Sequence, residues 1–262
     1  MDSHIQMPRV VLKEFVNDRH SYYKYCVLNN EITIGVPKKT YTEQDYYSEE
    51  MEQYLNQNIE TPLKTLIEFA KSISDKEDII SADSSVIDTG WAYLKSLLAR
   101  SKTCHNIFQQ RLIYGQFFLS SQSQHDLAVH NTFKLAGTLL NEKEFDFSFL
   151  TNLTSMPIVL PTRGIYEFTY NQVLCLIAPL SPRCAIFLKR HGKMLHPDMY
   201  ENSFIEIPIG CEERITYLNS IALRQQISEK TGYIVCPKRG VLNDLLSYAG
   251  ITPRWKNREH IR

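Results

Sequence analysis

The apolar and polar positions of this chain fall into three zones with different periodicities. In the first zone, residues 10–36, the pattern is typical of β-strands, with apolar and polar side chains in alternation. The alternation is interrupted at Asn29 and Asn30, which favour a tight turn. This zone therefore predicts a β-hairpin over residues 21–36.

The second zone, from about residue 48 to residue 141, has helical periodicity. Apolar residues recur there at a spacing of four, at Met51, Leu55, Ile59 and Leu63. The same kind of stripe predicts helices over residues 85–100, 104–119 and 125–140. Pro62 either starts a new helix, with Thr61 as its cap, or kinks a continuous one.

The third zone begins at Phe145 and returns to strand-like patterns. Alternation of Phe145, Phe147 and Phe149 with polar residues predicts a half-buried strand. Further strands are expected at residues 158–160, 173–178, 185–188, 204–207 and 233–235, and one amphipathic helix at about 212–230.

The order of these zones predicts an α+β fold. It has an N-terminal β-hairpin, a central helical block, and a C-terminal strand-rich region with one long helix. An isolated hairpin is marginal in water, so we expect residues 21–36 to pair with strands of the third zone. The helical block should pack against one face of the resulting sheet.

Length and composition fit one continuous globular body. A chain of 262 residues, of which 43% are hydrophobic, can bury a substantial core. We expect a single domain over residues 1–262, with a helical insertion at about residues 48–141. The 29 basic and 29 acidic residues give zero net charge, which does not indicate a nucleic-acid partner.

A local basic segment near the C-terminus leaves that question open. Arg254, Lys256, Arg258 and Arg262 surround Trp255 there. They form either a contact for nucleic acid or a solvated, frayed tail.

The six cysteines lie far apart in the sequence and form no Cys-x-x-Cys pair. This spacing predicts free thiols without a disulfide. His191 and His196, with Cys184 and Cys211 far to either side, do not indicate a zinc site. No leader sequence or membrane-spanning apolar run is evident, so we expect a cytoplasmic protein with no membrane partner.

Common catalytic motifs are absent or incomplete. The chain has no glycine-rich phosphate loop and no Gly-x-Ser-x-Gly elbow. Arg100 and His105 resemble the Arg-x4–6-His signature of HEPN ribonucleases, but such pairs also arise by chance, as a surface arginine and a helix-cap histidine. A Pro-Asp…Glu-x-Lys nuclease core would use Asp198 and Glu206, but Pro208 stands where its lysine belongs.

A block near the N-terminus resembles a known family. The spacing of His4, Pro8, Leu12 and Phe15 is similar to the opening block of the bacterial domain of unknown function 4238 family. Later blocks of that family are similar to Pro37-Lys38-Lys39, Tyr46-Tyr47, Glu52, Glu60, residues 153–159, residues 178–182 and Asn219. The resemblance implies a bacterial protein and makes a toxin or phage-defence setting plausible.

Two departures from the family pattern concern charged or metal-binding residue types. Ser155 stands where the family has an aspartate, and His4 is followed by Ile5 where the family has a second histidine. If those residues serve a catalytic or metal site, this chain is a diverged member with a weakened site.

Three side chains at family positions have the chemistry of a metal or acid–base site. An imidazole from His4 and carboxylates from Glu52 and Glu60 could hold a weakly bound divalent metal, which can generate hydroxide near neutral pH. Eight residues along an ideal α-helix leave Glu52 and Glu60 about 80° apart around its axis. The alternative is structural, with Glu52 on a solvated helix face and Glu60 serving a helix N-terminus.

The remaining candidates come from the third zone. Asn219 joins His4 and the two glutamates as a candidate catalytic residue, and Ser155 and Arg183 are candidates for substrate binding. Arg183 could bind phosphate or form a structural pair with an acid. We expect Ser155, in the loop after the first strand of this zone, to lie within reach of His4 or of the two glutamates.

Two classes of function follow from these residues. The first is a hydrolase, a phosphodiesterase or nuclease in a toxin or phage-defence setting. The second is a non-catalytic binding or regulatory protein whose family blocks maintain the fold, a class favoured by the loss of the aspartate at Ser155.

Overall fold

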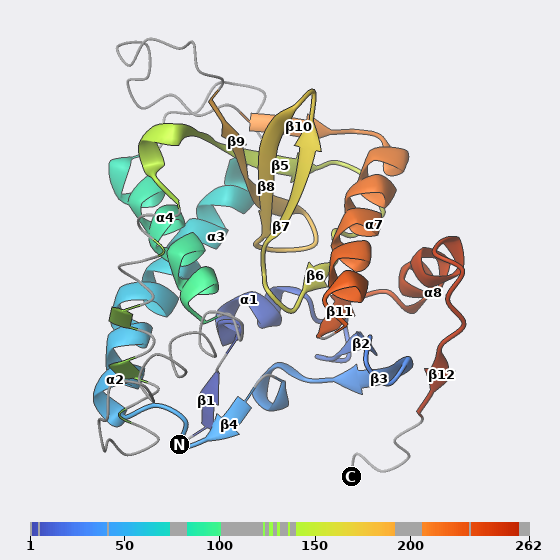
Figure 1. Ribbon diagram of the computed structural model, residues 1–262, viewed down its shortest axis with the longest axis horizontal. Coiled ribbons are helices and arrows are strands. Elements are labelled where there is room, and N and C mark those ends of the chain that lie inside the picture. Colours follow the sequence, from blue (N-terminus) through green and yellow to red (C-terminus); the bar gives the residue numbers. More distant parts are fainter. Residues whose placement is uncertain are drawn as a thin grey trace.

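The computed structural model describes most of the chain. It covers residues 2–4, 6–40, 42–73, 83–100, 140–191, 206–230 and 232–256, and residues 123, 126, 127, 130, 131 and 136. The predicted helix at 104–119 lies outside these residues, as do most of the helix at 125–140, His105, Asp198, Arg258 and Arg262. The architecture is α+β, as predicted (Figure 1).

The N-terminal segment contains a helix that the sequence pattern did not predict. Strand β1 (Asp2–His4) pairs antiparallel with β4 (Thr42–Gln44). The element that follows β1 in the chain is the helix α1 (Arg9–Glu14). The strand-like interpretation of residues 10–36 is therefore wrong at its start. Pro8 precedes the first helical turn, where no amide donor is needed. Val10, Val11 and Leu12 are buried, and this packing outweighs the β-preference of the valines.

The predicted hairpin is confirmed. Strands β2 (Tyr22–Cys26) and β3 (Glu31–Gly35) pair antiparallel, and Asn30 has a positive φ of 50° in the turn. The other strands of this sheet are β6 (Leu160–Pro161), β11 (Tyr233–Cys236) and β12 (Arg254–Trp255), in the order β12-β3-β2-β11-β6. The hairpin thus pairs with strands that follow Phe145, as expected. A short 3-10 turn, η1 (Pro37–Lys39), follows β3.

A second five-stranded sheet forms the centre of the molecule. Its order is β10-β5-β9-β8-β7, with β5 (Phe145–Asn152), β7 (Tyr166–Tyr170), β8 (Val173–Pro179), β9 (Cys184–Arg190) and β10 (Glu206–Ile209). Neighbouring strands are antiparallel except β10, which runs parallel to β5. The short turn η3 (Glu142–Glu144) leads into β5.

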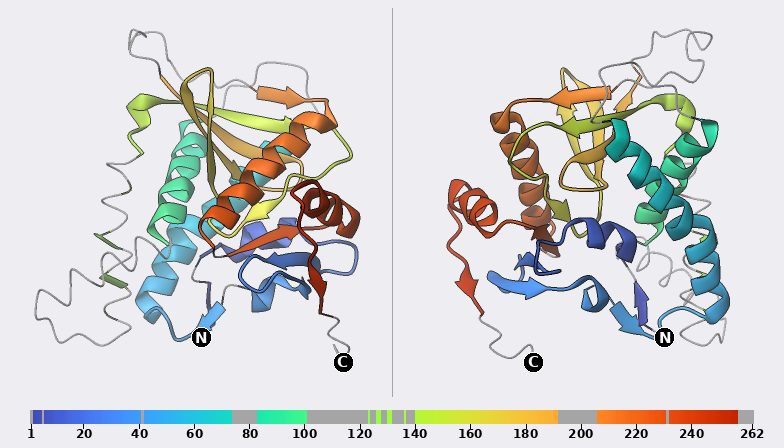
Figure 2. Two further views of the ribbon diagram at one scale, coloured as in Figure 1. Left: turned by 45° about the vertical axis from the view of Figure 1, so that its right-hand side comes forward. Right: turned by 180° about the vertical axis from the view of Figure 1, so that it is seen from behind.

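Helices cover both faces of this second sheet. They are α3 (Thr61–Ile73) and α4 (Ser84–Ala99) on one side and α7 (Glu212–Ser228) on the other (Figures 1 and 2). Phe149 and Ile186 share a core with the first pair, whereas Leu150 and Ala185 share a core with α7. The strand predicted at Phe145 is therefore confirmed, but the prediction that it is half-buried is wrong, because α7 covers the face that was expected to meet solvent.

One helical run joins the hairpin region to the central sheet. It consists of α2 (Glu49–Leu55), the π-helical segment η2 (Asn56–Glu60) and α3. Ser48 caps the start, because its hydroxyl accepts a hydrogen bond from the amide of Met51 at 3.1 Å. Of the two alternatives for Pro62, the continuous helix is the one observed, with a π turn directly before the proline.

Helix α8 (Arg239–Tyr248) was missed by the sequence interpretation. It buries Leu242, Leu245 and Leu246 against the sheet that contains β2 and β11. Spacings of three and four residues between these leucines are a readable helical signal, so the element was predictable.

The described cysteines bear out the prediction of free thiols. Cys26, Cys175, Cys184 and Cys236 are buried without a disulfide, and Cys211 is a partly exposed thiol. Cys104 lies outside the described residues. Within the described part of the chain, no helix combines the length and apolar character needed to cross a bilayer.

Candidate functional site

The structure divides the candidate residues between two separate places. Ser155, Arg183 and Asn219 surround the loop after β5, whereas Glu52 and Glu60 lie on the α2–α3 run. The backbone of His4 pairs with Thr42 in the β1–β4 ladder, and its side chain is outside the described part of the molecule.

The loop after β5 is held mainly by side chains that bind its backbone. The side-chain nitrogen Nδ2 of Asn152 donates to the carbonyl oxygens of Met156 at 2.6 Å and Pro182 at 3.1 Å. Arg183 donates through Nη1 to the carbonyl oxygen of Thr154. The partner observed for Arg183 is thus a backbone carbonyl of a neighbouring loop and not an acid, whereas its binding of a phosphate stays a prediction.

Asn219 connects α7 to the same loop. Its Oδ1 accepts from the amide of Val159 at 3.0 Å, and its Nδ2 donates to the carbonyl of Pro157 at 2.9 Å. The side chain is only 1% exposed. Both ends of the amide therefore serve the backbone, which gives Asn219 a positioning role in the fold.

Ser155 lies on the exposed side of this loop. Its hydroxyl donates to Oε1 of Glu212 at 2.6 Å, and Lys238 donates to its carbonyl oxygen at 2.7 Å. Figure 1 shows the start of α7, which carries Glu212, on the opposite side of the molecule from α2 and β1. The prediction that Ser155 reaches the two glutamates is wrong, because the loop runs toward α7 and away from α2.

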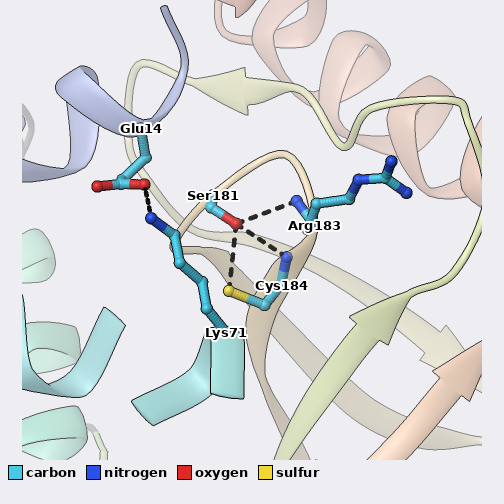
Figure 3. Close-up of polar contacts among 5 residues, drawn as sticks. All are labelled: Glu14, Lys71, Ser181, Arg183 and Cys184. Carbon is cyan, nitrogen blue, oxygen red and sulfur yellow. Dashed lines mark hydrogen bonds and ion pairs between the residues drawn. The ribbon is translucent and has the colours of Figure 1, made fainter. Parts of the chain in front are cut away.

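The turn between β8 and β9 contains a second serine with a structural role (Figure 3). The hydroxyl of Ser181 accepts from the amides of Arg183 at 3.0 Å and Cys184 at 3.1 Å, and lies 3.2 Å from the sulfur of Cys184. Burial raises the pKa of the Cys184 thiol to about 11, so this sulfur stays protonated near neutral pH. These contacts give Ser181 a structural role in the turn. The nearby ion pair of Lys71 with Glu14 joins α3 to α1.

Glu52 and Glu60 are brought together by the π-helical segment. A π turn holds about one residue more than an α turn and so changes the helical phase by about 100°. The offset of about 80° expected for an uninterrupted α-helix falls to about 20°. The two carboxylates therefore project from nearly the same face of the helix.

Glu60 faces the buried guanidinium of Arg100, at the end of α4. Their closest atoms, Oε1 and Nη1, are 3.8 Å apart, and the side chain of Arg100 is fully buried whereas that of Glu60 is 22% exposed. Burial raises the pKa of Glu60, and the negative charge of Glu52 adds to the rise. Arg100, Lys64 and Arg9 oppose the rise because their positive charges favour the carboxylate.

Tyr47 and Asp126 complete this polar group. Burial raises the pKa of Tyr47, while Arg100 opposes that rise and Glu52 and Asp126 add to it. Asp126 also accepts a hydrogen bond from the amide of Ser48 at 3.1 Å. Oε1 of Glu52 is shielded from solvent, and no described group donates a hydrogen bond to it.

The predicted metal set of His4, Glu52 and Glu60 stays a prediction, because the side chain of His4 is outside the described residues. Among the described side chains, no group of three histidine, cysteine, aspartate or glutamate residues is arranged to hold a metal ion. The charged group closest to Glu60 is the cation of Arg100, which would repel a metal ion at the same carboxylate. The group is better suited to proton transfer, because a desolvated carboxyl with a raised pKa can carry a proton nearer neutral pH.

Sequence reasoning missed several members of this group. Arg100 was considered only with His105 or as a surface residue, and its complete burial excludes the surface interpretation. The change in helical phase at the π turn could, however, be read from the sequence. Apolar steps of four residues from Met51 to Leu63 drift by about 40° each on an α-helix, and one π turn compensates most of that drift.

Comparisons with protein-family models, curated proteins and solved structures find no match to this chain. The resemblance to the domain of unknown function 4238 family therefore stays a prediction from the sequence blocks. Three of those blocks, residues 153–159, residues 178–182 and Asn219, meet around one loop. In this protein, the three blocks together hold that loop.

Proposed function

We propose that this protein is a hydrolase that cleaves phosphodiesters, with Glu52 and Glu60 as its acid–base pair. The observation that carries the proposal is the π turn, which places both carboxylates on one helix face beside Arg100. π turns within α-helices are rare and frequent at functional sites. The resemblance in sequence suggests a bacterial toxin or phage-defence setting for the reaction.

The chemistry follows from the unequal environments of the two carboxyls. Glu60 is held protonated to a higher pH by burial and acts as the general acid. Glu52 acts as the general base. A water oxygen attacks phosphorus while its proton passes to Glu52, the bond from phosphorus to the leaving oxygen breaks, and that oxygen takes the proton of Glu60.

Cations near Glu60 supply the binding of the phosphate. Arg9 and Lys64 are exposed and act electrostatically on Glu60, so the non-bridging oxygens of a phosphodiester can meet them from solvent. Arg100 is buried and does not reach solvent. It is a positioning residue that orients Glu60.

Replacement of the general acid tests the proposal. Glu60→Gln keeps the shape of the side chain and should lower the hydrolysis of a chromogenic phosphodiester by roughly 100-fold or more. Glu49→Gln, an exposed position in the first turn of α2, is the matched control and should leave the rate unchanged. Equal rates for both variants and the wild type would overturn the acid–base assignment.

The cellular setting has its own test. Induced expression in bacteria should slow growth and degrade nucleic acid with the wild-type chain but not with Glu60→Gln. Normal growth with intact nucleic acid in both cultures, at equal protein levels, would count against a toxin.

A second candidate function is a non-catalytic binding or regulatory protein that retains the family fold. It is favoured by the loop after β5, where Asn152, Arg183 and Asn219 are engaged by backbone groups. In that case neither the wild type nor the Glu60→Gln variant would cleave a phosphodiester.

A further inference from the structure

A row of exposed cations adjoins the Glu52–Glu60 pair, and the proposed reaction uses only part of it. The row, called the cationic row below, consists of Arg9, Lys13, Lys38, Lys39 and Lys64. All five side chains are exposed, although the chain as a whole has no net charge. Local clustering of this kind creates an electrostatic footprint that the total charge hides.

The fold gathers these residues from three elements. Arg9 and Lys13 are four residues apart on α1 and are exposed, while the three residues between them are buried. They therefore share the solvent face of the helix. Helix α1 packs against η1, which carries Lys38 and Lys39. The cations of α1 and η1 thus occupy adjoining surface.

The row ends at the proposed acid–base pair. Arg9 and Lys64 both act on the pKa of Glu60, so their charges lie close to its carboxyl. The ion pair of Glu14 with Lys71 fixes α1 on α3, and Figure 2 shows the two helices next to each other. A ligand that follows α1 toward its first residue would therefore arrive at Glu60.

The nearest acids do not neutralise the row. In the part of the chain that the structure describes, none of the five cations lies in an ion pair. Glu14 is bound by Lys71. Glu68 lies one helical turn beyond Lys64, and other acids, Glu49 and Glu50, stand at the start of α2. Exposed acids also follow both elements, Asp18 after α1 and Glu43 and Asp45 after η1, so the positive surface is confined to the row itself.

We propose that the cationic row binds the backbone of a single-stranded nucleic acid and leads it to Glu60. Repeated phosphate charges match a row of separate cations better than one small anion does. A single strand is flexible, so its successive phosphates can follow cations that stand on three different elements. That the bound strand is also the substrate rests on the hydrolase proposed above, whereas the binding itself does not.

Charge reversal within the row provides the test. Lys13→Glu/Lys39→Glu alters two cations that take no part in the proposed chemistry. Arg214→Glu/Arg224→Glu, at two exposed positions on α7, changes the net charge equally and is the matched control. The probe is a fluorescent oligonucleotide of one sequence, made as single-stranded RNA, as single-stranded DNA and as a duplex, with its affinity measured by anisotropy at several salt concentrations.

We expect the row variant to bind the single strand roughly tenfold more weakly than the wild type, and the control to bind it as the wild type does. The slope of log affinity against log salt should fall by about 1.4, from about 0.7 for each lost phosphate contact. Preference for RNA or DNA would identify the natural strand. Equal affinities for the two variants, or tighter binding of the duplex, would overturn the proposal.

The binding and the reaction can fail separately. Hydrolysis of a small chromogenic phosphodiester should be unchanged in Lys13→Glu/Lys39→Glu, because that substrate is too short to span the row. A Glu60→Gln variant should bind the oligonucleotide normally. If the row variant loses binding while Glu60→Gln keeps full hydrolytic activity, the binding role of the cationic row is supported and the acid–base role of Glu52 and Glu60 is contradicted.

Discussion

Two polar groups in this protein differ in what their side chains do. Around the loop after β5, the side chain of Asn152 binds three backbone groups, that of Asn219 binds two, and Arg183 binds a backbone carbonyl. On the α2–α3 run, Glu60 is drawn toward Arg100 but remains 3.8 Å from it and keeps a raised pKa. The first group fixes backbone, whereas the second holds ionisable groups in an unfavourable environment.

This difference separates structural from reactive polar residues. Fully hydrogen-bonded buried groups rigidify a fold and have little capacity left for a ligand. Carboxyls whose pKa is shifted by burial and by charged neighbours are candidates for proton transfer. The resemblance in sequence predicts a single site, but the structure places Ser155 and Asn219 around the loop after β5 and places Glu52 and Glu60 on the α2–α3 run.

Removal of Arg100 should have the largest effect on stability. Arg100→Met would leave Glu60 without its nearest positive charge, and we expect a loss of about 3 kcal/mol in the free energy of unfolding. Denaturant unfolding would measure this loss, with Arg224→Met on the surface as the control. The double variant Arg100→Met/Glu60→Gln should recover part of it. A loss below about 0.5 kcal/mol would show that Glu60 and Arg100 are not coupled.

Loss of the Asn219 amide should have the next largest effect. Asn219→Ala would leave the amide of Val159 and the carbonyl of Pro157 without their partner, and we expect a loss of about 2 kcal/mol. Asn243→Ala on α8, half-buried, is the comparison variant. If thermal unfolding shows the two variants equally stable, the loop does not depend on this amide.

The raised pKa of Glu60 predicts a pH dependence of a definite sign. The carboxyl binds its proton more tightly in the folded state, so its contribution to stability is present below the ordinary pKa of 4.5 and is lost as pH rises through the folded value. As pH rises from 4.5 through the folded pKa, the free energy of unfolding of the wild type should therefore fall relative to that of Glu60→Gln. The expected fall is about 1.4 kcal/mol for each unit by which the pKa is raised. Melting temperatures of both proteins from acid to neutral pH would show it. Parallel curves would contradict the raised pKa.

The smallest effect is expected at Ser155. Its hydrogen bond to Glu212 is exposed, so Ser155→Ala should cost about 0.5 kcal/mol or less. Ser155→Asp would place a second carboxylate beside Glu212 and should lower the melting temperature slightly, equally with and without magnesium. A metal-dependent rise in melting temperature for Ser155→Asp would restore a metal site at this loop.

Local periodicity predicted much of the fold. The hairpin at residues 21–36, its pairing with strands after Phe145, and the helix near residues 85–100 follow from short-range patterns and are all present. Helix α1 did not follow, because its valines favour strands and only their burial in the core makes the helix preferable. The second buried face of β5 likewise depends on α7, which is distant in sequence.

For the candidate site, the sequence by itself singled out Glu52 and Glu60, from their residue type and from their positions in the blocks that resemble the family. It also contained the apolar spacing of four that accompanies the π turn. Only the tertiary structure decided their environment. The complete burial of Arg100 beside Glu60, and the contact of α1 with η1 that gathers the cationic row, depend on packing between elements far apart in the chain. Charge and desolvation act through space, and a linear pattern does not specify distances in space.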